Sequence, residues 1–135
     1  MEAETRLAKR KQLNVGVVGI GRMGLSHALN ILHKVPRANL LCVCSPKDAD
    51  LKWADEHLVP YDVQVYRTFE EMIATPQLEA VIIASLSSLH AEHTKAALQR
   101  GIHVLCEKPV CTSADEVSRV RFKTSWHFML TVDHS

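Results

Sequence analysis

The chain has 135 residues, a length that fits one domain and leaves little room for a second. Hydrophobic residues make up 47% of it, enough for a substantial core, and sixteen basic against fifteen acidic residues give a net charge of +1. This balance indicates no affinity for nucleic acid or for an acidic membrane, and no apolar run reaches the ~20 residues that span a bilayer. We therefore expect a cytoplasmic protein.

Residues 1–12 carry a short basic run, Arg6-Leu-Ala-Lys-Arg-Lys11. The run has no hydrophobic segment behind it, which favours a flexible basic arm over a targeting signal.

Short apolar runs then alternate with segments of helical periodicity. The expected strands are 13–19, 40–44, 63–66, 80–84 and 103–106. The expected helices are 23–33, one opened by Ser45-Pro46, one opened by Thr68, one over 89–100 and one opened by Thr112. This alternation requires a parallel sheet covered by helices on both faces, so the predicted fold class is α/β, a doubly wound parallel sheet of the Rossmann type.

Several helix ends carry their own signals. Ser45 can cap a helix whose first position suits Pro46, and Thr68 to Glu71 has the capping-box pattern. Ser87 or Ser88 can cap the helix over 89–100, and Gly101 stands where a helix stops.

The spacing of the cysteines does not indicate a metal site. Cys42 and Cys44 are two residues apart, so on a strand they share one face and are expected to be small buried hydrophobes. His90 and His93 lie one turn apart, and we expect two partly exposed histidines at a helix start rather than ligands. No metal site is predicted.

The first motif that indicates a ligand site is Gly19-x-Gly21-x-x-Gly24, between the first expected strand and the first expected helix. In a βαβ unit the first glycine permits the tight turn, the second lets the backbone approach a pyrophosphate, and the third lets the helix pack closely on the strand. The amides at the helix N-terminus then attract phosphate. This placement favours a dinucleotide site over a plain turn, with Gly19, Ile20, Gly21, Arg22, Met23 and Gly24 as its residues.

The end of the second strand bears on the choice of cofactor. An acidic residue about 20 positions after the glycines would hold the ribose hydroxyls of NAD. The sequence has Ser45 there, with Lys47 close by. A hydroxyl and an ammonium suit a 2′-phosphate, which favours NADP slightly over NAD; Ser45 as a helix cap explains the same residues equally well.

Three stretches carry a family resemblance: Gly19-Ile-Gly-Arg-Met-Gly-Leu-Ser-His27, Val81-Ile-Ile-Ala-Ser-Leu-Ser-Ser-Leu-His90 and Gly101-Ile-His-Val-Leu-Cys-Glu-Lys-Pro109. Together they resemble the N-terminal domain of the Gfo/Idh/MocA oxidoreductases over about residues 13 to 117. The resemblance implies a Rossmann domain, NAD or NADP as cofactor, and hydride transfer on a sugar, cyclitol or related polyol. In the family this domain is joined to a second α/β domain that builds the substrate site and the oligomer interface.

The resemblance also implies roles for single residues. Glu107-Lys108-Pro109 matches the family's E-K-P motif, which makes Lys108 the catalytic candidate and places Glu107 and Lys108 beside the cofactor. Ser85 and Leu86 match the Thr-Pro of a segment that lines the cofactor crevice, with leucine in place of the proline. His90 matches the histidine of that segment and is expected at the cofactor too.

The chain departs from the family after Val117. The second domain, with its catalytic aspartate and histidine, has no counterpart, and we expect 13–117 to be the dinucleotide-binding domain and 118–135 a divergent tail. Residues 128–132 can form a last strand, or the tail is foreign to the fold.

Three accounts of the chain follow. It represents a polyol-oxidising or reducing enzyme by its cofactor domain, which can form homo-oligomers; or it is a catalytically inactive, truncated dinucleotide-binding module; or it is a marginal fragment with an exposed sheet face.

Overall fold

The computed structural model describes residues 11–107 and the backbone of residues 129–132. Its strands form one six-stranded sheet in the order β3-β2-β1-β4-β5-β6, and every neighbouring pair is parallel. The strands are β1 (Leu13–Val18), β2 (Ala38–Cys44), β3 (Gln64–Tyr66), β4 (Ala80–Ile83), β5 (His103–Glu107) and β6 (Met129–Val132). This order is that of the Rossmann fold and confirms the predicted fold class.

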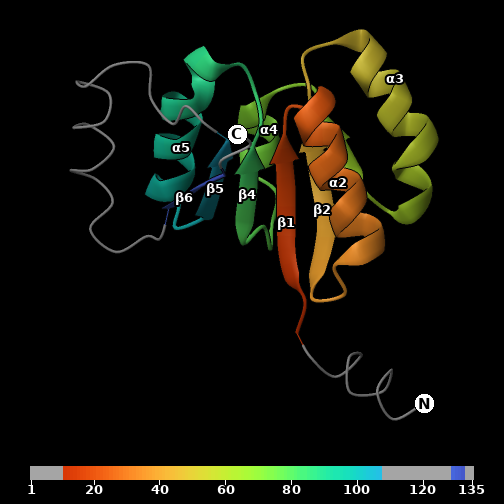
Figure 1. The fold of residues 1–135 in the computed structure, drawn as a ribbon, viewed down its shortest axis with the longest axis horizontal. Helices are drawn as coiled ribbons and strands as arrows, with labels where there is room; N and C mark the ends of the chain where they lie inside the picture. The colour runs from red at the N-terminus through yellow and green to blue at the C-terminus, as the bar shows by residue number, and fades with distance from the viewer. Residues whose placement is uncertain (1–10, 108–128, 133–135) are drawn as a thin grey trace.

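Helices cover both faces of the sheet (Figure 1). The helices are α2 (Arg22–Lys34), α3 (Asp48–His57), α4 (Phe69–Ile73) and α5 (His90–Gln99), with 3-10 turns η1 (Val59–Tyr61) and η2 (Ser87–Leu89). Two separate hydrophobic clusters fill the space between the sheet and its helices, one beneath α2 and α3 and the other beneath α4 and α5. The sheet is therefore buried on both faces, which explains why its strands are continuous apolar runs.

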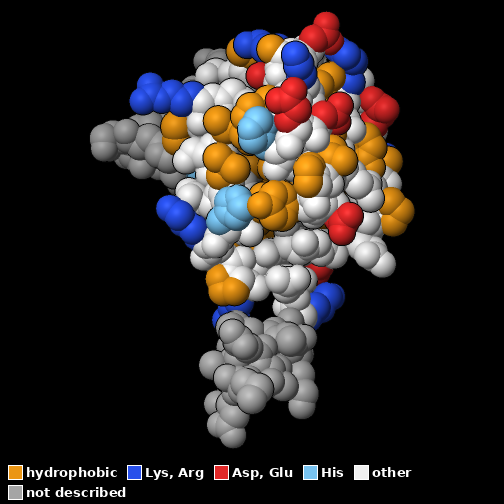
Figure 2. Space-filling model, turned by 90° about the vertical axis from the view of Figure 1, so that its right-hand side faces the viewer, with side chains coloured by type: hydrophobic (Ala, Val, Ile, Leu, Met, Phe, Trp, Pro, Cys, Tyr) orange, Lys and Arg blue, Asp and Glu red, His pale blue; other side chains and the backbone are white. Residues whose placement is uncertain are grey.

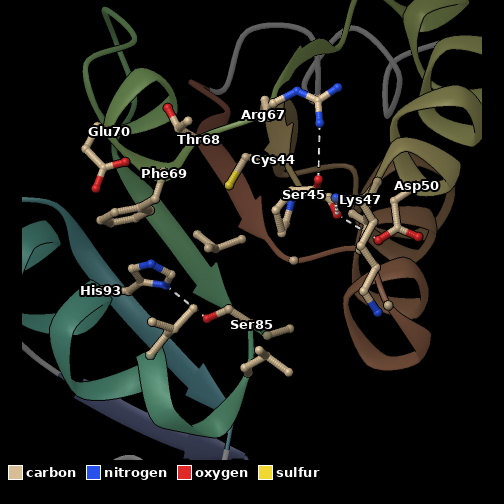
Figure 3. A pocket seen from close by; sticks show the side chains of 18 residues that line it. Cys44, Ser45, Lys47, Asp50, Arg67, Thr68, Phe69, Glu70, Ser85 and His93 are labelled. Atoms are coloured by element: carbon tan, nitrogen blue, oxygen red, sulfur yellow. Dashed lines mark hydrogen bonds between the residues drawn. The ribbon is translucent and has the colours of Figure 1, made fainter.

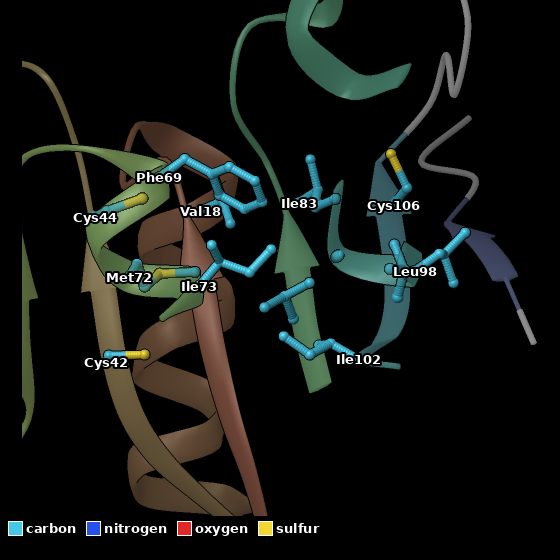
Figure 4. Close-up of a cluster of buried hydrophobic side chains, with 13 residues drawn as sticks. Val18, Cys42, Cys44, Phe69, Met72, Ile73, Ile83, Leu98, Ile102 and Cys106 are labelled. Atoms are coloured by element: carbon cyan, nitrogen blue, oxygen red, sulfur yellow. The ribbon is translucent and has the colours of Figure 1, made fainter. Parts of the chain in front are cut away.

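The cluster beneath α4 and α5 contains the two cysteines of β2 (Figure 4). Cys42 and Cys44 are both buried there, beside Met72 of α4. Burial raises the pKa of each thiol to about 12. The prediction that these residues act as small buried hydrophobes on one face is confirmed.

Two helix starts differ from the sequence prediction. Ser45 does not cap α3, and Pro46 does not occupy its first position, because the helix begins at Asp48 with Lys47 at the N-cap. The N–H of Ser45 instead donates to the carbonyl of Tyr66 and extends the contact between β2 and β3. Ser87 and Ser88 lie in η2, and α5 starts after Leu89 without a side-chain cap.

The other signals are confirmed. Thr68 caps α4, accepting a hydrogen bond from the N–H of Glu71 at 3.2 Å. Gly101 has φ 75° and ends α5 by donating to the carbonyl of Leu98.

The C-terminal segment supplies β6, which pairs with β5 from Val104–Met129 to Glu107–Val132. Of the residues expected to form a last strand, 129–132 form β6. The helix expected from Thr112 and residues 1–10 of the arm expected over 1–12 lie outside the described residues, and the domain divisions stay predictions.

The side of the molecule formed by α2 and α3 carries no dominant charge (Figure 2). Lys and Arg side chains are scattered around its edge with acidic side chains beside them, and hydrophobic side chains lie between. Among the described residues, no helix is long and apolar enough to cross a membrane.

Candidate functional site: a cavity at the switch point of the sheet

Gly19 and Gly24 have the geometry that was predicted for them in the turn. Gly19 has φ 84°, in the region that favours glycine, and an added Cβ would lie 2.8 Å from the carbonyl oxygen of Ala84. A Cβ on Gly24 would lie 1.7 Å from the carbonyl oxygen of Gly19, so α2 packs directly on the turn. A Cβ on Gly21, in contrast, would meet no atom within 4 Å. Gly21 is thus the point at which the backbone is open to a ligand.

The N-terminus of α2 is well suited to an anion. The helix has 13 residues, Gly21 occupies its N-cap without a side-chain hydrogen bond, and its first turn holds no acidic residue. The first amides of a helix have no intrahelical partner, and the helix dipole adds positive potential there. Nothing in the turn competes with a phosphate for these groups.

A cavity of about 400 Å³ opens beside this turn (Figure 3). It lies between the carboxyl ends of β1, β2, β3 and β4 and is lined by Gly19 and Gly21 on one side and by Ser85 on another. Since β1 and β4 are neighbours in the sheet, this is the switch point where open α/β sheets bind their ligands. Its volume is in the range of small-molecule sites.

At the end of β2, the cavity wall is made by Ser45, Lys47 and a residue that the sequence did not point to, Asp50. The Ser45 hydroxyl donates to Oδ2 of Asp50 at 2.7 Å and accepts from the N–H of Lys47 at 3.3 Å. Arg67, from the loop after β3, lines the same wall. Its guanidinium donates to the carboxylate of Asp48 at 2.7 Å and to the carbonyl of Pro46 at 3.2 Å.

The loop after β4 forms the opposite wall. Leu86, which stands where the family has proline, has φ −54°, close to the value that a proline would impose. The loop therefore keeps an extended course, and the Leu86 side chain is 71% exposed over the cavity.

His90 and His93 support this loop from α5. His90 is 2% exposed, and its Nε2 donates to the carbonyl of Ser85 at 2.7 Å, so the expectation of a partly exposed side chain at this position was wrong. Helix α5 turns His90 under the loop and its neighbour on the next turn, His93, toward the cavity.

His93 makes contacts on two sides. Its Nδ1 lies 2.9 Å from the Ser85 hydroxyl, and its ring packs on Phe69 with centroids 4.2 Å apart. Partial burial lowers the pKa of His93, which favours a neutral imidazole at neutral pH.

The carboxyl end of β5 is joined to α2. Glu107 is buried, and its carboxylate bonds to Nε2 of His27. The pair connects the glycine-turn helix with the strand after which Lys108 follows.

The predicted site residues divide into three groups. Seven line the cavity: Gly19, Ile20, Gly21, Ser45, Lys47, Ser85 and Leu86. Five lie outside its lining: Arg22, Met23, Gly24, His90 and Glu107. Lys108 lies outside the described residues, and the cofactor-binding and catalytic roles of all these residues stay predictions.

Sequence reasoning missed Asp50, Arg67, Phe69 and His93, which also line the cavity. Phe69 and Arg67 flank Thr68, so the recognised capping box marked the loop at the end of β3 without showing that it faced the site. Among the described residues, no group of three or more potential ligands could hold a metal ion.

A family model described as an oxidoreductase family with an NAD-binding Rossmann fold, GFO_IDH_MocA, matches residues 13–123. The chain belongs to this family. The match covers strands β1 to β5, the glycine turn and the E-K-P motif, and it confirms the resemblance seen in the sequence.

Individual relatives are similar over the same region. An inositol 2-dehydrogenase of Agrobacterium fabrum is 32% identical over 108 residues, which are 80% of this chain and 32% of that protein. A D-xylose 1-dehydrogenase (NADP(+)) of Haloferax volcanii is 45% identical over 67 residues, which are 50% of this chain and 20% of that protein. The Gfo/Idh/MocA chain therefore spans about a third or less of the length of these relatives.

A solved structure gives the same comparison in three dimensions. Scyllo-inositol dehydrogenase from Lactobacillus casei, with bound NAD(H) and scyllo-inositol, superposes with a TM-score of 0.80 at 31% identity. The superposition covers 90% of this chain and 36% of that one.

Proposed function

We propose that this chain is the cofactor-binding domain of an NAD(P)-dependent oxidoreductase that transfers hydride to or from a polyol, sugar or cyclitol. The observation that carries the proposal is the cavity at the switch point, where the open backbone at Gly21 and the uncapped N-terminus of α2 meet. Family membership and the NAD(H)-bound relative support the same ligand.

The residues of the cavity fit a dinucleotide in their chemistry. The N-terminus of α2, after Gly21, offers backbone amides for a pyrophosphate, and the polar groups at the end of β2 suit the adenosine ribose. When bound, the nicotinamide accepts or donates the hydride. Lys108, in the E-K-P motif, is the group that we propose to stabilise charge on the reacting oxygen of the substrate.

The substrate class is proposed from the relatives. Their names specify inositols and D-xylose, which are small and polyhydroxylated. A polyol also suits hydride transfer, since each secondary alcohol can be oxidised to a ketone. A cytoplasmic location and homo-oligomer formation stay predictions of the sequence.

The preference between NADP and NAD depends on the few residues at the end of β2. The slight preference for NADP depends on Ser45 and Lys47, which both line the cavity, and the NADP(+)-dependent relative agrees with it. The hydrogen bond from Ser45 to Asp50 argues against it, because the hydroxyl is already donating to a carboxylate.

The test is an assay of the purified chain with NAD⁺ or NADP⁺ and a panel of inositols and pentoses, read as formation of reduced nicotinamide. Turnover that is lost in Lys108→Ala, with cofactor binding kept, would support the oxidoreductase and the role of Lys108. Cofactor binding without turnover of any polyol would favour the alternative, an inactive dinucleotide-binding module. A folded chain that binds neither cofactor would contradict both.

A further inference from the structure

The structure brings a carboxylate to the place where the sequence has none. Asp50, from the first turn of α3, lies against Ser45 at the end of β2, with 2.7 Å between its Oδ2 and the serine hydroxyl. Both residues line the cavity that contains Gly21 (Figure 3). Asp50 is partly exposed, whereas Ser45 is only 2% exposed. A ligand in the cavity therefore meets the carboxylate more readily than the hydroxyl.

The Ser45 hydroxyl is already engaged in both directions. It donates its hydrogen to Asp50 and accepts from the N–H of Lys47. A phosphate needs donors, and this hydroxyl has one hydrogen to give. Ser45 is therefore a poor phosphate ligand while Asp50 is ionised.

One of the two cations along this wall is already paired. Arg67 donates to the carboxylate of Asp48 and to the carbonyl of Pro46. Lys47 lines the wall as an exposed cation. Over the whole lining, Asp50 and Glu70 balance Lys47 and Arg67, so the cavity carries no excess positive charge.

We propose that Asp50 is the cofactor-selecting residue of this site, and that it favours NAD over NADP. This inference rests on the proposed function. A carboxylate accepts hydrogen bonds from the two hydroxyls of the adenosine ribose of NAD. These hydrogen bonds are charge-assisted and strong. A 2′-phosphate would replace one hydroxyl by a group of about two negative charges, which the carboxylate repels.

The substitution Asp50→Asn tests the effect of the carboxylate charge alone. The asparagine carbonyl can still accept from the Ser45 hydroxyl, so the hydrogen bond at the end of β2 is kept while the negative charge is removed. Asp55→Asn is the matched control, since Asp55 lies on the same helix, is exposed and does not line the cavity. NADH and NADPH are titrated by fluorescence into the full chain and both variants, and thermal unfolding confirms that each is folded.

We expect the full chain and Asp55→Asn to bind NADH more tightly than NADPH. In Asp50→Asn the preference should fall about tenfold or more, through weaker NADH and tighter NADPH binding. An unchanged ratio of the two dissociation constants in Asp50→Asn, or tighter binding of NADPH by the full chain, would overturn the role of Asp50 and leave the proposed function intact. Binding of neither cofactor by the folded chain would overturn the proposed function as well.

Discussion

The glycines of the motif Gly19-x-Gly21-x-x-Gly24 have different structural roles. The space around each glycine shows which role it has. Gly24 is fixed by packing, because its α-hydrogen side faces the carbonyl of Gly19, whereas Gly21 has free space around it. The packing role predicted for Gly24 is confirmed, and the role of Gly21 at a pyrophosphate stays a prediction.

Gly24→Ala should therefore destabilise the fold. A methyl group 1.7 Å from a backbone oxygen forces α2 away from the turn, at a cost of about 3 kcal/mol or more. The measurement is the free energy of unfolding in urea. Gly21→Ala is the control and should cost less than about 1 kcal/mol, because its Cβ meets nothing. Equal stabilities of the two variants would contradict this account of the turn.

His93 should make stability depend on pH. Its pKa is lowered from the ordinary 6.5 chiefly by burial, so the unfolded chain binds this proton at a higher pH than the folded chain does. The free energy of unfolding therefore falls as the pH drops below 6.5, because the unfolded chain takes up the His93 proton first. The loss levels off below the pKa of His93 in the folded chain. His93→Gln, which does not titrate, should lose less stability over this interval than the parent chain. Parallel stability curves for the two proteins would refute the shift.

At the scale of elements, the alternation of strands and helices was predictable because each element has a strong local signal. Buried parallel strands are continuous apolar runs, and Thr68 and Gly101 mark helix ends through hydrogen bonds within their own segments. Ser45 was a wrong cap signal, since α3 starts only at Asp48. The N–H of Ser45 continues the pairing with β3, a contact with a residue far along the chain that has no local signal.

The same limit applies to the site. The glycine turn is local and was found, but Asp50, Phe69 and His93 reach the cavity from three different helices. Only the folded sheet shows which residue of each helix faces inward. His90 and His93 lie about one turn apart on the same helix, and periodicity alone could not tell which of them lines the cavity.

The bond between His27 and Glu107 should hold α2 against the end of β5. Removing the imidazole takes one partner from a buried carboxylate, which costs about 1–3 kcal/mol. His27→Ala should lower the free energy of unfolding by this amount, measured by urea denaturation. Asn30→Ala, at an exposed position of the same helix, should change it little. If both variants unfold at the same urea concentration, the pair does not join these elements.

At the scale of the whole molecule, the two hydrophobic clusters make the sheet inaccessible from either face. Burial raises the pKa of Cys42 and Cys44 to about 12. The reactivity of these thiols therefore reports whether the core stays closed to solvent. In the native chain both should resist alkylation by N-ethylmaleimide, because a buried thiol is neither exposed nor ionised.

Peptide mapping by mass spectrometry would follow each cysteine separately, with the urea-unfolded chain as the fully labelled control. Labelling of Cys42 and Cys44 should rise together with the unfolding transition. Rapid modification of either residue under native conditions would show that the core beneath α4 opens without unfolding and would favour the marginal fragment considered from the sequence.

The proposed function requires that the turn from Gly19 to Gly24 forms a working dinucleotide site. The most direct test is a fluorescence titration of the chain and of Gly21→Ala with NADH. We predict saturable binding by the chain and at least tenfold weaker binding by Gly21→Ala at nearly unchanged thermal stability, because a methyl group at Gly21 would occupy the space open to the pyrophosphate. Equal affinities, or no binding by a chain shown to be folded, would leave the glycines as a structural turn and contradict the account.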